Sequence, residues 1–168
     1  MYRFLKSLHL LGLTLFLGSI FSHIVAGTVG GTVGGADFLA ARAEIDAATR
    51  ALTLPGLGVA ILSGIALAFL SPARRAWMGV HAALAATIAI LAAMVIVPAG
   101  RAALAGAAAL AQGQGDIERV RAALMTEHVA GAINIVLTLV VLALGVYKPA
   151  LRLFARRNPQ PRTTQGGA

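Results

Sequence analysis

The stretch VAGAINIVLTLVVLALGVY, residues 129–147, runs for nearly twenty positions without a charged side chain. A hydrocarbon layer about 30 Å thick is crossed by a helix of about 20 apolar residues. Three other stretches of the chain are similarly long and apolar. We therefore predict an all-α fold, a transmembrane four-helix bundle with helices at about residues 5–26, 52–70, 77–97 and 125–147.

The composition agrees with a membrane protein. Hydrophobic residues make up 58% of the chain and charged residues 12%, which is unlike a water-soluble domain. The net charge is +8, but the basic residues gather next to the apolar stretches, where membrane topology explains them, so we do not expect nucleic-acid binding. Because the chain has no cysteine, disulfides, iron–sulfur clusters and thiolate haem ligation are excluded, and histidine is the strong metal ligand that remains.

The basic residues also predict the orientation. They form three clusters, before the first helix, between the second and third, and after the fourth: Arg3 and Lys6; Arg74 and Arg75; Lys148, Arg152, Arg156, Arg157 and Arg162. Positively charged loops stay in the cytoplasm, so both termini are predicted there, in a multi-pass protein of the bacterial cytoplasmic (inner) membrane. The two longer connections would then lie outside, with short surface helices at residues 36–50 and 117–123. The transmembrane domain would cover residues 1–155, followed by a disordered cytoplasmic tail at 156–168.

Four histidines lie within or at the ends of the apolar stretches: His9, His23, His81 and His128. An ionisable side chain inside a membrane segment is costly and is usually functional. On the predicted topology His9 and His81 lie near the cytoplasmic boundary, and His23 and His128 lie near the outer one. His9 and His23 are 14 positions apart, which in a helix is about 21 Å of rise and an angular offset of about 40°, so they share a face.

Glycines accompany these histidines. The pattern His-x-x-Gly occurs twice, ending at Gly12 and at Gly131, and a glycine allows a flat macrocycle to approach the helix backbone. The helix at residues 52–70 also carries small residues, which we expect to form a face for close helix packing. They are Gly56, Gly58, Ser63 and Gly64.

Pairs of histidines from facing helices are typical of bis-histidine haem ligation in a helix bundle. We therefore predict two b-type haems, one held by His9 and His81 and one by His23 and His128. The haem propionates would meet basic residues at the two interfaces. These are Arg3, Lys6, Arg74 and Arg75 inside, and Arg42, Arg50 and Arg101 outside. Any single histidine near a helix end could instead reach the headgroups or bond to a neighbouring helix, but the matched levels favour haem.

Short motifs resemble a known group. LKSLHLLG at residues 5–12 and LGS at 17–19 resemble the first helix of the small bacterial membrane proteins grouped around HemJ and CopD, and of a related uncharacterised family of predicted integral membrane proteins. In that family TLPG, here at 53–56, followed by a glycine is also familiar. Trp77 and His81 resemble a Trp-Leu-His segment of HemJ-like proteins. The resemblance implies that His9 and His81 hold one b-type haem.

These observations predict a membrane b-type cytochrome that relays electrons across the membrane between a quinone or a periplasmic partner and an acceptor. Two alternatives stay open. One is a single-haem, HemJ-like membrane oxidoreductase that uses only His9 and His81. The other is a haem-free membrane subunit or small transporter, in which the glycine-rich faces pack against another protein of an oligomer or a larger complex.

Overall fold

The fold consists of long helices in the part of the chain that the structure describes. A computed structural model describes residues 1–70 and 76–147. Four helices in it are long and apolar enough to cross a membrane: Tyr2–Val29, Phe38–Leu70, Trp77–Ala111 and Ile117–Tyr147. The predictions of an all-helical fold and of a multi-pass membrane protein are thereby confirmed. The predicted tail at 156–168 and the basic residues at 74, 75 and beyond 147 lie outside the described residues.

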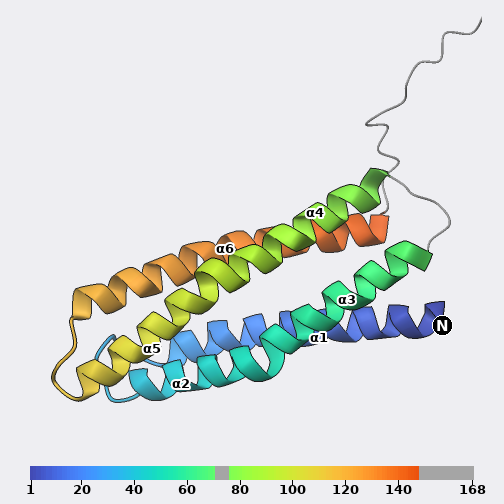
Figure 1. The fold of residues 1–168 in the computed structure, drawn as a ribbon. Coiled ribbons are helices and arrows are strands. Elements are labelled where there is room, and N and C mark those ends of the chain that lie inside the picture. The colour runs from blue at the N-terminus through green and yellow to red at the C-terminus, as the bar shows by residue number, and fades with distance from the viewer. Residues whose placement is uncertain (71–75, 148–168) are drawn as a thin grey trace, which may run out of the picture.

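The long helices are built from six α-helical segments. These are α1 (Tyr2–Val29), α2 (Phe38–Ala48), α3 (Leu54–Leu70), α4 (Ala76–Leu91), α5 (Val97–Ala111) and α6 (Ile117–Tyr147). A π-helical turn at Thr49–Thr53 joins α2 to α3, and another at Ala92–Ile96 joins α4 to α5. Figure 1 shows the start of α1, the end of α3, the start of α4 and the end of α6 at one end of the bundle, here called the terminal end. The connections from α1 to α2 and from α5 to α6 lie at the opposite, loop end.

The helices extend beyond the predicted spans. The helix Phe38–Leu70 has 33 residues, a rise of about 50 Å, which exceeds a hydrocarbon layer of about 30 Å. Residues 36–50 and 117–123 were predicted to form separate surface helices. In the structure their helical parts are instead the first turns of the continuous helices that begin at Phe38 and Ile117. The bundle therefore continues as packed helices past the apolar spans.

Proline explains the two π-helical turns. Pro55 and Pro98 each follow such a turn by two positions, and a proline has no N–H to donate and clashes with the carbonyl four residues earlier. The wider turns relieve this conflict, since the N–H of Leu54 bonds the carbonyl of Thr49 and the N–H of Val97 bonds the carbonyl of Ala92. The helices consequently continue past both prolines, including Pro98, before which the predicted span 77–97 ends. Turns of this kind occur frequently at functional sites.

Two helical hairpins make up the bundle. In the first, α1 packs along α3, and in the second, α6 packs along α4 and α5. Between the hairpins, the main close backbone approach is that of α2 to α5 at the loop end. Side chains fill the middle of the bundle, where Phe16, Ile88 and Val141 form a buried cluster, and a second cluster at the loop end is formed by Phe38, Ala107 and Val120.

Glycine sets the distance between α1 and α3. A Cβ atom on Gly12 would lie 2.6 Å from the backbone nitrogen of Ala60 and 2.8 Å from the carbonyl oxygen of Gly56. A Cβ on Gly56 would lie 2.7 Å from the backbone nitrogen of Phe16. The predicted packing face is therefore confirmed at Gly56, whereas a Cβ on Gly58 would meet nothing within 4 Å.

We expect Gly12→Ala to lower the free energy of unfolding by about 1–3 kcal/mol, because the new methyl group must push two helix backbones apart. Unfolding in mixed micelles titrated with sodium dodecyl sulfate would measure it. Gly18→Ala is the matched control on the same helix, since a Cβ there meets nothing within 4 Å. It should leave stability unchanged or raise it slightly through helix propensity. Equal losses in both variants would contradict the close crossing.

Candidate functional site

A cavity of about 440 Å³ lies in the loop half of the bundle, which is a volume typical of small-molecule sites. Its walls come from α1, α2, α5, α6, both π-helical turns and Leu54 at the start of α3, and they are mainly apolar. The polar side chains of the wall include His23, Arg42, Thr49, Glu127, His128 and Asn134. The two histidines predicted for the outer level thus line the same cavity.

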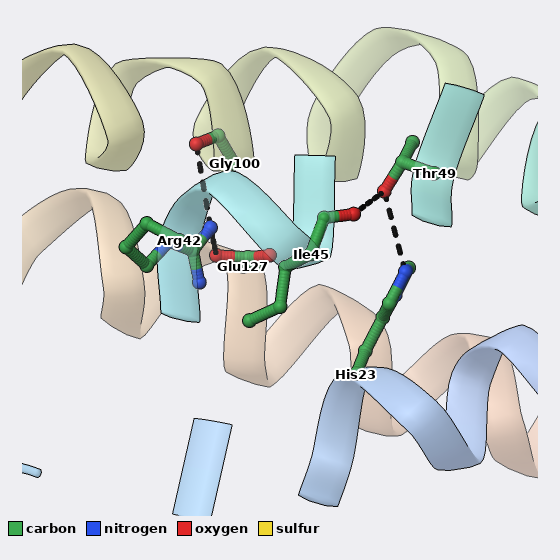
Figure 2. A network of polar contacts seen from close by, with 6 residues as sticks. All are labelled: His23, Arg42, Ile45, Thr49, Gly100 and Glu127. Atoms are coloured by element: carbon green, nitrogen blue, oxygen red, sulfur yellow. Dashed lines mark hydrogen bonds and ion pairs between the residues drawn. The ribbon is translucent and has the colours of Figure 1, made fainter. Parts of the chain in front are cut away.

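The two outer histidines differ in their surroundings. His128 is exposed, and Gly131, one turn further along α6, borders open space, since a Cβ there would meet nothing within 4 Å. The Nε2 atom of His23 lies 3.4 Å from the hydroxyl oxygen of Thr49, which donates its own hydrogen to the carbonyl of Ile45 at 2.8 Å (Figure 2). Thr49 therefore accepts a hydrogen from His23 Nε2. In this arrangement Nε2 of His23 is protonated and Nδ1 holds the free lone pair.

A buried ion pair between α2 and α6 lies in the cavity wall. Arg42 of α2 donates from Nη2 to Oε2 of Glu127 of α6 at 2.7 Å and to the carbonyl of Gly100 of α5 at 3.3 Å (Figure 2). The two side chains are 5% and 15% exposed, so the pair is largely removed from solvent. Gly100 leaves room for it, because a Cβ there would lie 3.3 Å from Glu127 Oε1. Three helices are tied together at this point.

Two polar atoms near the cavity lack partners. Arg42 Nε and Asn134 Oδ1 are buried and have no hydrogen-bond partner among the residues that the structure describes, and both residues are only 4% exposed. Asp46, also on the cavity wall, forms an ion pair with Arg50. Both carboxylates of the wall are thus paired. Arg101, another charged side chain of the wall, is exposed.

At the terminal end, His9 is oriented by α3. Its Nδ1 lies 2.8 Å from the carbonyl oxygen of Ala60 and 3.3 Å from Ser63 Oγ. A carbonyl oxygen only accepts, so Nδ1 carries the hydrogen and Nε2 holds the free lone pair. Metal-ligating histidines almost always donate their other ring N–H in this way. The ring lies against Gly64, where a Cβ would come within 3.2 Å of Cε1.

The ring of His81 has similar surroundings on the other hairpin. Its ring lies against Gly145 of α6, where a Cβ would be 3.6 Å from Cε1, and it meets Trp77 edge to face with ring centroids 6.1 Å apart. Its Nδ1 is buried and has no partner in the described part of the chain. The two rings thus belong to opposite hairpins and each rests on a glycine of a neighbouring helix.

The structure supplies residues that sequence reasoning missed. Gly64 and Gly145 have no sequence signal linking them to a histidine, and Glu127 reads as a solvated carboxylate at a helix end. Gly12 was predicted to face a macrocycle, but in the structure it packs against the backbone of α3. Gly131, predicted in the same way, borders the cavity. Over residues 1–70 and 76–147, no three His, Asp or Glu side chains gather as a site for a bare metal ion.

Comparison of the chain with protein-family models, with curated proteins and with solved structures finds no match. The resemblance to HemJ- and CopD-like proteins therefore stays a prediction.

Proposed function

We propose that this protein is a membrane b-type cytochrome of the bacterial cytoplasmic membrane, with His9 and His81 as the axial ligands of a haem. The observation that carries the proposal is the hydrogen bond from His9 Nδ1 to the Ala60 carbonyl, because it leaves Nε2 unprotonated and fixes the plane of the ring. A backbone carbonyl cannot change its role, so this tautomer is built into the fold.

The donor set fits a bis-histidine haem. The two imidazoles come from α1 and α4, one from each hairpin, and these helices make at most a marginal backbone approach within the described residues. When bound, the haem supplies a one-electron couple between ferric and ferrous iron. Electron relay rather than bond-making chemistry is the function that such a ligand pair favours.

The neighbouring side chains hold the ligands in place. Gly64 and Gly145 leave space for the rings, and Trp77 limits the rotation of His81 through the edge-to-face contact. The buried cluster of Phe16, Ile88 and Val141 fills the bundle core with apolar side chains. A low-dielectric environment of this kind tunes a haem potential, and exposed Arg3 and Lys6 at the same end are available to propionates.

The predicted second haem has less support. His23 and His128 do line one cavity, but Nε2 of His23 is engaged by Thr49, and the same cavity contains the Arg42–Glu127 ion pair. A haem ligated by His23 through Nε2 would require this hydrogen bond to break. We therefore base the proposal on the pair at the terminal end.

The test is a haem-to-protein ratio with reduced-minus-oxidised spectra on protein purified in mild detergent from haem-replete cells. We expect about one haem per chain, lost in His9→Ala and in His81→Ala and retained in His23→Ala and His128→Ala. Colourless wild-type protein would overturn the proposal and favour a haem-free membrane subunit. A ratio near two that falls to about one in His23→Ala would establish the two-haem cytochrome in its place.

A further inference from the structure

We propose that the cavity of about 440 Å³ in the loop half of the bundle binds a single-chain lipid anion, such as a fatty-acid carboxylate. The charged head group lies next to Arg101, and the chain extends toward the middle of the bundle. This binding goes beyond the proposed electron relay and does not require the haem. It is supported by the charges of the wall, by the order of polar and apolar residues along it, and by its opening between two helices.

The charges of the cavity wall leave one cation without a carboxylate. Glu127 forms an ion pair with Arg42, and Asp46 forms one with Arg50. Arg101 also lines the cavity, and it forms no ion pair in the described part of the chain. A guanidinium stays charged and binds a carboxylate or a phosphate through parallel hydrogen bonds, which are stronger than those to a neutral group. The wall therefore complements a negatively charged head group.

Arg101 and His128 lie at the same level of the bundle. The residues that precede them in their helices come together, because the Gly100 carbonyl and the Glu127 carboxylate both accept hydrogen bonds from Arg42 (Figure 2). Arg101 and His128 are both exposed, and both line the cavity. A guanidinium from α5 and an imidazole from α6 are thus available as hydrogen-bond donors to a head group at this level.

The wall becomes more apolar toward the middle of the bundle. Helix α1 runs toward the loop end and α6 runs away from it, so Phe16 and Ile20 of α1 and Ile135 of α6 lie on the side of the bundle centre (Figure 1). The wall residues of α1 extend from Phe16 to Thr28, 12 positions apart, which is a rise of about 18 Å. A ligand with one charged end and an apolar chain matches this order. The volume is typical of a site for one small molecule, which favours a single chain over a whole phospholipid.

The cavity opens between α1 and α6. Its exposed wall residues include Ile24 and Thr28 of α1 and His128 and Ala132 of α6. Within the described residues these two helices make at most a marginal backbone approach, so they leave room for an opening between them. Both belong to the apolar spans, and a lipid dissolved in the bilayer can enter from the side.

Binding of radiolabelled dodecanoate to the full-length protein in nanodiscs of zwitterionic lipid tests the inference, with binding to empty nanodiscs subtracted. We expect saturable binding. Unlabelled dodecanol has the same chain without the charge, and it should compete at least about 10-fold less well than unlabelled dodecanoate. Arg101→Gln should weaken the binding of dodecanoate by about 10-fold. The matched control is Arg119→Gln, an exposed arginine at the same end of the bundle outside the cavity wall, which should bind like the wild type.

A second pair of variants tests the position of the chain. Gly131→Phe should weaken binding at least about 10-fold by filling the cavity, because Gly131 lines it and a Cβ there meets nothing within 4 Å. Gly18→Phe is the matched control, since a Cβ on Gly18 also meets nothing within 4 Å and this residue lies outside the cavity wall. It should bind dodecanoate like the wild type.

The outcomes separate this inference from the haem proposal. Absence of saturable binding, or equal binding by Gly131→Phe and wild type, would overturn the lipid site whatever the haem content. Equal competition by dodecanol, or wild-type affinity in Arg101→Gln, would overturn the anionic head group. Binding that persists in His9→Ala after the haem is lost supports the site as independent of the haem. Loss of a haem in His23→Ala would assign the cavity to haem and overturn the inference.

The same assay distinguishes the two anionic head groups that an arginine binds. Dodecyl phosphate replaces dodecanoate as the competitor, with the chain unchanged. Tighter binding of dodecanoate supports a fatty acid as the ligand, whereas tighter binding of dodecyl phosphate supports a single-chain lipid phosphate. Failure of both to compete with the label would overturn the anion site.

Discussion

Replacing Glu127 with alanine is expected to lower the free energy of unfolding by about 3–5 kcal/mol. The carboxylate is the charged partner of Arg42, whose side chain is 5% exposed. Without it, the guanidinium would stay buried with a full positive charge and only the Gly100 carbonyl at 3.3 Å as an acceptor. Equilibrium unfolding in mixed micelles titrated with sodium dodecyl sulfate measures the loss.

Two further variants identify the cause. Glu118→Ala removes an ion pair with Arg121 from the same helix, but this pair is exposed, with side chains 72% and 58% accessible, so the loss should stay below about 1 kcal/mol. The double replacement Arg42→Met with Glu127→Leu removes both charges and should recover most of the stability lost in the single variant. A double variant as unstable as Glu127→Ala would show that packing, and not the unpaired charge, is responsible.

The fold was predictable from hydropathy as far as the number of spans. Four apolar stretches free of charge leave few alternatives, and residues 1–70 and 76–147 contain four helices of that kind. Their ends were not predictable, because Pro55 and Pro98 resemble helix boundaries. Each lies just after a π-helical turn that carries the helix past it. Whether a proline ends a helix or bends it depends on tertiary packing, which local sequence does not contain.

The site was predictable in its residue types and not in its contacts. The histidines stood out because ionisable residues are rare in apolar segments. Their partners depend on how the helices are rotated: His9 meets Ala60, 51 positions away, and Arg42 meets Glu127, 85 positions away. Nothing in a single sequence links such positions. The cavity that joins His23 to Asn134 is likewise a product of the packing between α1, α2 and α6.

Replacing Gly64 with leucine is expected to reduce the haem content at least about 10-fold, a loss of the size seen when the outer partners of a metal ligand are removed. Even a Cβ at this position would lie 3.2 Å from Cε1 of His9, and the larger side chain occupies the space of the ring. The imidazole must then rotate away from Ala60, which breaks the hydrogen bond at Nδ1 and misdirects Nε2. Haem-to-protein ratios on the purified variant give the result directly.

Gly58→Leu is the matched control, because Gly58 lies on the same helix and a Cβ there meets nothing within 4 Å. It should keep the wild-type haem content. Circular dichroism and size-exclusion chromatography distinguish loss of haem from loss of fold. Gly64→Ala is a smaller change, and this variant should retain haem with a shifted reduction potential. A folded Gly64→Leu variant that binds haem as the wild type does would contradict this prediction. It would show that His9 binds haem without the contact to Gly64 and without the hydrogen bond to the Ala60 carbonyl.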